Sequence, residues 1–120
     1  MSIATRKQGD VVIFEMEGKL DLGPAVDDFR TGWSDALATG SRHVVVNLTK
    51  VPAIDSSGIG SLIRCHSAVV ARRGSMKVVG ACGVVLQALR LTHVDQVLEF
   101  HETEDSALAS VRPGDGSTKR

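Results

Sequence analysis

Two serines, Ser56 and Ser57, follow Asp55 at the point where a helical pattern begins, and they are the residues best placed for chemistry. Apolar side chains recur at helical spacing after them, which predicts that the serines lie in a helix's first turn. Asp and Ser are favoured cap residues, so a purely structural role also explains them. A helix N-terminus is, however, where free N–H groups and the dipole stabilise a phosphate. A hydroxyl there can accept a phosphate without unfolding its helix.

Two glycines, Gly58 and Gly60, belong to the same predicted turn. Inside a helix, glycine costs roughly 1 kcal/mol relative to alanine, so a pair of them needs a reason. We expect them to leave a low surface that the backbone of a partner protein approaches closely. The motif is therefore interpreted as a protein-binding surface around a modifiable serine.

Other patterns that could indicate a site are weaker. The segment 80–83, Gly-Ala-Cys-Gly, follows a predicted strand but lacks the third glycine of a dinucleotide loop. Ser57 is not in a Gly-x-Ser-x-Gly elbow, and there is no Gly-x-x-x-x-Gly-Lys-Ser/Thr phosphate loop. The four histidines have no metal-ligand spacing and are expected in core or surface roles: His43, His66, His93 and His101. We expect no catalysis by the chain itself, and no metal or other cofactor.

The composition is that of a globular domain with no nucleic-acid partner. The 120 residues suit one domain, and 42% hydrophobic with 23% charged residues is ordinary. The 14 basic residues match the 14 acidic ones and are scattered, whereas nucleic-acid-binding domains concentrate positive charge on one face. Four aromatic residues give no stacking platform: Phe14, Phe29, Trp33 and Phe100.

The sequence predicts a cytoplasmic protein. Its first ten residues contain no apolar stretch of the kind found in signal peptides, and no run of 18 apolar residues predicts a membrane span. The two cysteines, Cys65 and Cys82, are then expected to be reduced thiols.

Strand and helix patterns alternate along most of the chain, which predicts an α/β layer structure. Strands are expected at 2–7, 11–17, 43–48, 76–79 and 97–100, with the first two paired across a turn at 8–10. Helices are expected at 24–39, from 56 to a stop at Gly74, at 84–91, and after a cap at Thr103. We predict a single domain, 1–111, with a mixed sheet of four to five strands packed with about four helices. Residues 112–120 contain no apolar side chain and are expected to form a flexible C-terminal tail.

The segment 44–60, VVVNLTKVPAIDSSGIG, closely resembles the STAS domains, in particular the bacterial anti-sigma factor antagonists. The stretch 18–21, Gly-Lys-Leu-Asp, followed by a helix is similar to the same family. The strand around 77–79, the short helix after it and the segment 97–100 also follow the family's order. The resemblance covers residues 3–110 and implies a STAS-like fold.

The resemblance also implies a function. The second serine of the Asp-Ser-Ser-Gly motif, here Ser57, is expected to be the phosphorylation site. The dephosphorylated form would bind an anti-sigma factor that is a serine kinase and so free the sigma factor, and a serine phosphatase would reverse the modification. Asp21 matches a position that relatives use at the partner surface. The expected partner-binding residues are Asp21, Asp55, Ser56, Ser57, Gly58 and Gly60.

Within this motif, Ser56 is expected to turn its oxygen toward the helix backbone as a cap, which leaves Ser57 outward. The Asp55 carboxylate is expected to stabilise the helix start. The chain departs from the family at two places. Asp21 is followed by Leu-Gly-Pro rather than a Thr- or Ser-rich helix start, and His93 stands where relatives often have glycine. Histidine tolerates left-handed geometry, so the turn at His93 is expected to survive.

Two other functions stay open. The same family includes subunits of larger stress-signalling scaffolds, in which case the protein should form large assemblies. It also includes small-ligand modules that bind nucleotides or serve lipid transport. A lipid-transport partner would not require a phosphorylatable serine, and this sequence keeps one.

Overall fold

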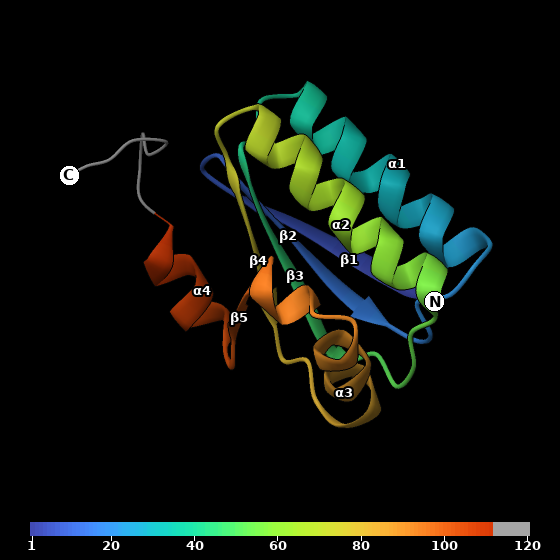
Figure 1. Cartoon of the computed structure of the whole chain (residues 1–120). Coiled ribbons are helices and arrows are strands. Elements are labelled where there is room, and N and C mark those ends of the chain that lie inside the picture. The colour runs from blue at the N-terminus through green and yellow to red at the C-terminus, as the bar shows by residue number, and fades with distance from the viewer. Residues whose placement is uncertain (112–120) are drawn as a thin grey trace.

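Five strands form one mixed sheet in the order β1-β2-β3-β4-β5. A computed structural model describes residues 1–111 of the chain (Figure 1). The strands are β1 Ser2–Gln8, β2 Val11–Glu17, β3 His43–Lys50, β4 Ser75–Val79 and β5 Glu99–His101. The helices are α1 Pro24–Ala38, α2 Ser56–Ala71, α3 Gly83–Leu91 and α4 Glu104–Ser110, with a 3-10 turn, η1, at Val94–Gln96. The predicted fold class is confirmed.

The sheet is mixed because of its first hairpin. The pair β1–β2 is antiparallel and joined by a tight turn, whereas the pairs β2–β3, β3–β4 and β4–β5 are parallel. Parallel neighbours need a crossover, and here each crossover contains a helix. The strands β2, β3 and β4 therefore all end at the same edge of the sheet, and the loops that lead to α1, α2 and α3 start there.

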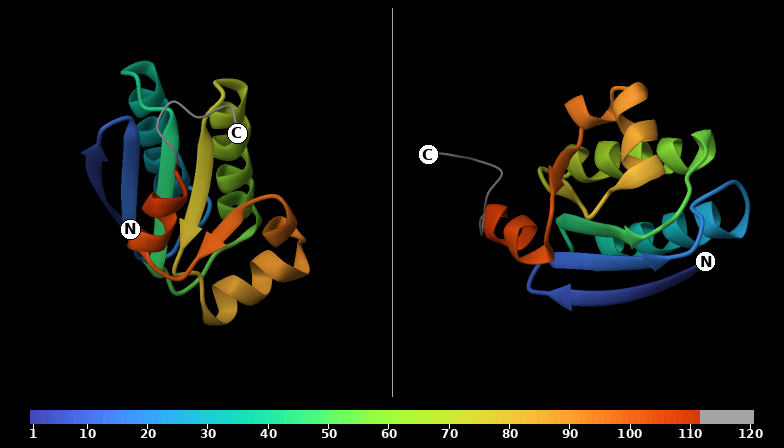
Figure 2. Two further views of the ribbon diagram at one scale, coloured as in Figure 1. Left: turned by 90° about the vertical axis from the view of Figure 1, so that its left-hand side faces the viewer. Right: turned by 90° about the horizontal axis from the view of Figure 1, so that it is seen from below.

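Helices cover both faces of the sheet, and the side chains of each strand alternate between them. The helices α1 and α2 lie side by side on one face, and α4 lies on the other (Figure 2). Val12, Phe14 and their alternate neighbours in β2 and β3 pack with α1, α2 and α3 in the larger core. Val11, Ile13 and Val45 point the opposite way, into a small core with Ala107 of α4.

Two predicted boundaries were wrong for identifiable reasons. The expected strand at 97–100 begins only at Glu99, because η1 precedes it and buries Val94 against the core. The helix α2 ends at Ala71, before the predicted stop at Gly74, and Arg73 takes the left-handed conformation, with φ 61°. Gly74 is needed for another reason: a Cβ there would lie 1.6 Å from the carbonyl oxygen of Arg42.

Of the predicted C-terminal features, the cap at Thr103 lies within the described residues. Thr103 caps α4, as expected, and its side-chain oxygen accepts a hydrogen bond from the Ser106 N–H at 3.1 Å. The predicted tail, 112–120, lies outside the described residues. Between residues 1 and 111, no helix combines the length and apolar character that crossing a membrane requires.

Candidate functional site

The first turn of α2 is anchored by Asp55, whose carboxylate joins two segments of the chain. One oxygen, Oδ1, accepts a hydrogen bond from the Gly58 N–H at 2.8 Å, and the other, Oδ2, accepts from the Leu22 N–H at 3.0 Å. These N–H donors, that of Gly58 first and that of Leu22 second, lower the pKa of Asp55. The expected stabilising role of this carboxylate at the helix start is thus matched by its geometry.

The expectation that Ser56 caps the helix was wrong. The cap is Asp55, with the extended backbone typical of that position, and Ser56 and Ser57 are the first two helical residues. Asp55 bonds both the helix and the loop, because its second oxygen accepts from the Leu22 N–H. Ser56 is exposed and Ser57 is half-buried, which is the reverse of the orientation expected for the two side chains. Neither hydroxyl forms a side-chain hydrogen bond within residues 1–111.

The loop after β2 is brought against the start of α2. Leu20 pairs with Ile54 in an isolated parallel bridge, and the Leu20 N–H donates to the Ala53 carbonyl at 3.0 Å. Asp21 follows directly and so lies in the same structural unit as Asp55, 34 positions later in the sequence. The structure thereby brings Asp21 together with the other predicted partner-binding residues, which lie between Asp55 and Gly60.

One exposed apolar residue in this unit was missed from the sequence. Leu22 keeps its backbone fixed on Asp55 while 75% of its surface is exposed. The Leu-Gly-Pro stretch after Asp21 is the only sequence signal for it, and nothing in that stretch shows that the side chain faces solvent. Exposed apolar side chains beside polar groups are common at the centre of protein interfaces.

The two glycines of the motif have different roles. Gly58 is buried, and a Cβ there would lie 2.2 Å from the Leu20 carbonyl oxygen and 2.7 Å from Ile54 Cγ1. The close approach that Gly58 permits is therefore made by the chain's own backbone, and this reason replaces the expected low surface for a partner. Gly60 is half-buried, and a Cβ there would meet only the mobile tip of a side chain, with Arg64 Nη1 at 3.3 Å.

Ser57 lies on a helical face that it shares with a glycine and an arginine of α2. No histidine, cysteine or lysine forms a hydrogen bond to either serine within residues 1–111. The same part of the chain contains no group of three or more His, Cys, Asp or Glu side chains that could hold a metal ion. Arg64 and Gly60 follow Ser57 at positions i+7 and i+3, so all three share one helical face. Arginine side chains on helices point back toward the N-terminus, which directs this guanidinium toward the first turn.

The turn after α3 confirms one further expectation. His93 adopts the left-handed conformation, with φ 62°, where many relatives were expected to have glycine. The chain continues from this turn directly into η1. This departure is therefore a local substitution that leaves the fold unchanged.

Solved structures from several bacteria share this fold. A Thermotoga maritima protein assigned as a candidate anti-sigma factor antagonist superposes with a TM-score of 0.85 at 23% identity, over 92% of this chain and 94% of that one. An anti-sigma factor antagonist from Mycobacterium paratuberculosis gives 0.79 at 19% identity, over 92% and 93%. The Bacillus cell fate determinant SpoIIAA, in its phosphorylated form, gives 0.74 at 20% identity, over 92% and 100%. At these identities the likeness shows a shared fold.

The family itself is shown by a sequence comparison. The family model for the STAS domain matches residues 2–107, which include all five strands and the first turn of α2. The match spans nearly the whole described chain and agrees with the fold of the solved structures. The chain belongs to the STAS domain family.

Proposed function

We propose that this protein is an anti-sigma factor antagonist whose binding to a partner is switched by phosphorylation of Ser57. The observation that carries the proposal is the position of Ser57: it is the second residue of α2, with an unbonded hydroxyl, next to a cap that ties α2 to the Asp21–Leu22 loop. A phosphate there enters a helix N-terminus, where it is tolerated without unfolding the helix. Structural relatives of this fold include SpoIIAA in unphosphorylated and phosphorylated forms.

The proposed partner surface consists of Asp21, Leu22, Ser56, Ser57 and Gly60. It combines an exposed apolar side chain, a carboxylate and two hydroxyls on adjacent segments. Asp55 supports this surface by holding the loop and the helix together. We propose that the partner is an anti-sigma factor that is also a serine kinase, and that a serine phosphatase restores the binding form. The protein would act in the cytoplasm without binding nucleic acid or spanning a membrane.

Phosphorylation is proposed to act at the interface and not on the fold. The phosphate adds about −1.5 to −2 charges. The Asp55 carboxylate, two residues before Ser57, already places negative charge at this helix start, and a phosphate would be desolvated near it when a partner binds. Unfavourable charge at an interface costs several kcal/mol, and each 1.4 kcal/mol is a tenfold change in affinity. Within the free protein, Arg64 on the same face of α2 would offset part of the added charge.

The test uses purified partner and calorimetry. Ser57→Ala should bind like the wild type, and Ser57→Asp should bind roughly ten- to a thousandfold more weakly. Ser56→Asp is the matched control, because it adds the same charge one residue earlier on a more exposed side chain. It should weaken binding less. Melting curves of all three variants should stay close to that of the wild type.

Two results would contradict the switch. One is full-strength binding by Ser57→Asp, and the other is loss of binding that tracks unfolding of the variant. Incubation with ATP and the kinase, followed by mass mapping, should place phosphate on Ser57, and phosphate on the Ser57→Ala protein would exclude that site. Formation of large assemblies by the purified protein would instead favour the scaffold function.

A further inference from the structure

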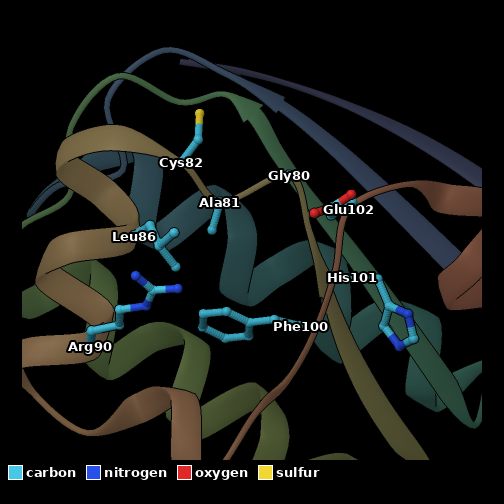
Figure 3. Close-up of a pocket in the computed structure, with 8 residues that line it drawn as sticks. All are labelled: Gly80, Ala81, Cys82, Leu86, Arg90, Phe100, His101 and Glu102. Atoms are coloured by element: carbon cyan, nitrogen blue, oxygen red, sulfur yellow. The ribbon is translucent and has the colours of Figure 1, made fainter.

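A cavity of about 430 Å³ lies beside α3, at the carboxyl ends of β4 and β5. Gly80, Ala81 and Cys82 follow β4, Glu102 follows β5, and Leu86 and Arg90 project from α3 (Figure 3). In open parallel sheets, ligands commonly bind outside the carboxyl ends of the strands. The volume falls in the usual range for small-molecule sites. None of these residues belongs to the proposed partner surface.

The cavity has an apolar floor between two charged groups. Figure 3 shows the ring of Phe100 and the side chains of Leu86 and Ala81 around its centre, with Arg90 on one side and Glu102 on the other. The His101 ring, although a neighbour in sequence, points away and is hydrogen-bonded to Ser106 at 2.7 Å. The charged side chains that border the cavity are therefore one cation, Arg90, and one anion, Glu102.

These two charges are unpaired within the described residues. Neither the Arg90 guanidinium nor the Glu102 carboxylate takes part in a hydrogen bond or ion pair in residues 1–111, and the two groups do not pair with each other across the cavity. Nearby charges on β5 are different, since Glu99 accepts from Lys77 at 2.9 Å. The cavity thus presents a guanidinium and a carboxylate that face it from opposite sides, each with free bonding capacity.

This arrangement selects a ligand by its charges. A simple anion would suit Arg90 but would stand in the same cavity as the Glu102 carboxylate, and like charges repel. A simple cation would suit Glu102 but would be repelled by the Arg90 guanidinium. A molecule with a carboxylate and an ammonium group satisfies both, because guanidinium binds carboxylate through paired hydrogen bonds and a carboxylate accepts from ammonium. An apolar side chain on the same molecule would cover Leu86 and Phe100.

We infer that this cavity binds a small zwitterion with an apolar side chain, of the amino-acid class, with its carboxylate on Arg90 and its ammonium on Glu102. An aromatic side chain would pack on Phe100 in an edge-to-face or offset arrangement. This site lies apart from Ser57, so its occupancy gives the domain a second input that is separate from phosphorylation.

The test uses L-phenylalanine as the probe and the full chain as the protein. Calorimetry should give a Kd on the order of 0.1 mM. Two truncated analogues separate the charges: 3-phenylpropanoate lacks the ammonium and 2-phenylethylamine lacks the carboxylate. Each should bind wild type at least about tenfold more weakly than L-phenylalanine. Amide shifts in NMR spectra should change at Gly80, Ala81 and Glu102 first.

The variants assign each charge to its residue. In Glu102→Gln, the preference for L-phenylalanine over 3-phenylpropanoate should fall to near unity, while the preference over 2-phenylethylamine is kept. Arg90→Gln should show the opposite pattern. Arg72→Gln and Asp95→Asn, which change exposed charges outside the cavity, should bind as wild type does. The inference is overturned if millimolar L-phenylalanine produces no heat and no shifts, if both analogues match it, or if each variant weakens both preferences equally.

Discussion

The starts of α2 and α3 lie at the same edge of the sheet but are capped in different ways. Each helix follows a parallel strand, β3 or β4, at the same edge of the sheet. At α2 the cap is Asp55, and its carboxylate bonds both the helix and a distant loop. At α3 the cap is Cys82, which has the same extended backbone but no side-chain hydrogen bond to the helix.

The difference extends to the packing around each helix. At α2, Gly58 lets the helix backbone touch the Leu20 carbonyl, so the space between helix and loop is filled. At α3, the side of the helix that bears Leu86 and Arg90 borders the 430 Å³ cavity. A tight, bonded start suits a surface that must present a serine in a fixed position, whereas a looser one leaves room for a ligand.

Gly58→Ala should be the most damaging change at the α2 start. The added Cβ would overlap the Leu20 carbonyl oxygen, and backbone cannot move aside as a side chain can. Overpacking of this kind should lower the free energy of unfolding by about 3 kcal/mol, measured by urea denaturation. Gly60→Ala is the matched control, since only Arg64 must move. It should be neutral or stabilise by about 0.5–1 kcal/mol. Equal losses in both variants would show that the Leu20 contact does not set the packing.

Asp55→Ala should lower the melting temperature by several degrees, because it removes the cap and releases the Leu22 N–H. Asp55→Asn should lose less, since asparagine also caps well. If Asp55→Ala melts like the wild type, the cap does not stabilise α2 and the residue would act only at the partner surface.

The contribution of Asp55 should also depend on pH. Hydrogen bonds from Gly58 and Leu22 hold its pKa below the ordinary value of 3.8. The folded protein therefore binds this proton less readily than the unfolded chain, and the stabilisation is complete above pH about 4. It should be lost as the pH falls through the folded pKa. The difference in unfolding free energy between wild type and Asp55→Ala should shrink over that acidic range, and a constant difference would exclude the charge as its source.

Cys82→Asp should strengthen the start of α3. The extended backbone of Cys82 already fits a cap, and a carboxylate there could accept from the first-turn N–H groups. We expect a gain of about 0.5–1 kcal/mol in the free energy of unfolding, the smallest of these effects. Cys82→Ala supplies the control, without an acceptor, and should give no gain. If both variants behave alike, the two helix starts do not differ through capping.

Much of the fold could be predicted from local patterns. The short β-branched run at 43–48 predicted a strand, and apolar residues at helical spacing predicted α1 and α2. Prediction was weaker where local signals compete. The strand β5 begins late, at Glu99, because η1 intervenes, and the left-handed residue after α2 is Arg73, one position before the predicted stop at Gly74. In both cases a contact with another element, and not residue preference, set the boundary.

The candidate site divides in the same way. The sequence by itself determined that Asp55, Ser56 and Ser57 start a helix, because residue preferences at helix ends act within four residues. Three features depended on tertiary structure: the second bond of Asp55 to Leu22, the contact of Gly58 with Leu20, and the meeting of Arg90 with Glu102 at one cavity. Each joins segments that are distant along the chain. Such pairs come together only when the sheet aligns the ends of its parallel strands, and no local pattern encodes that alignment.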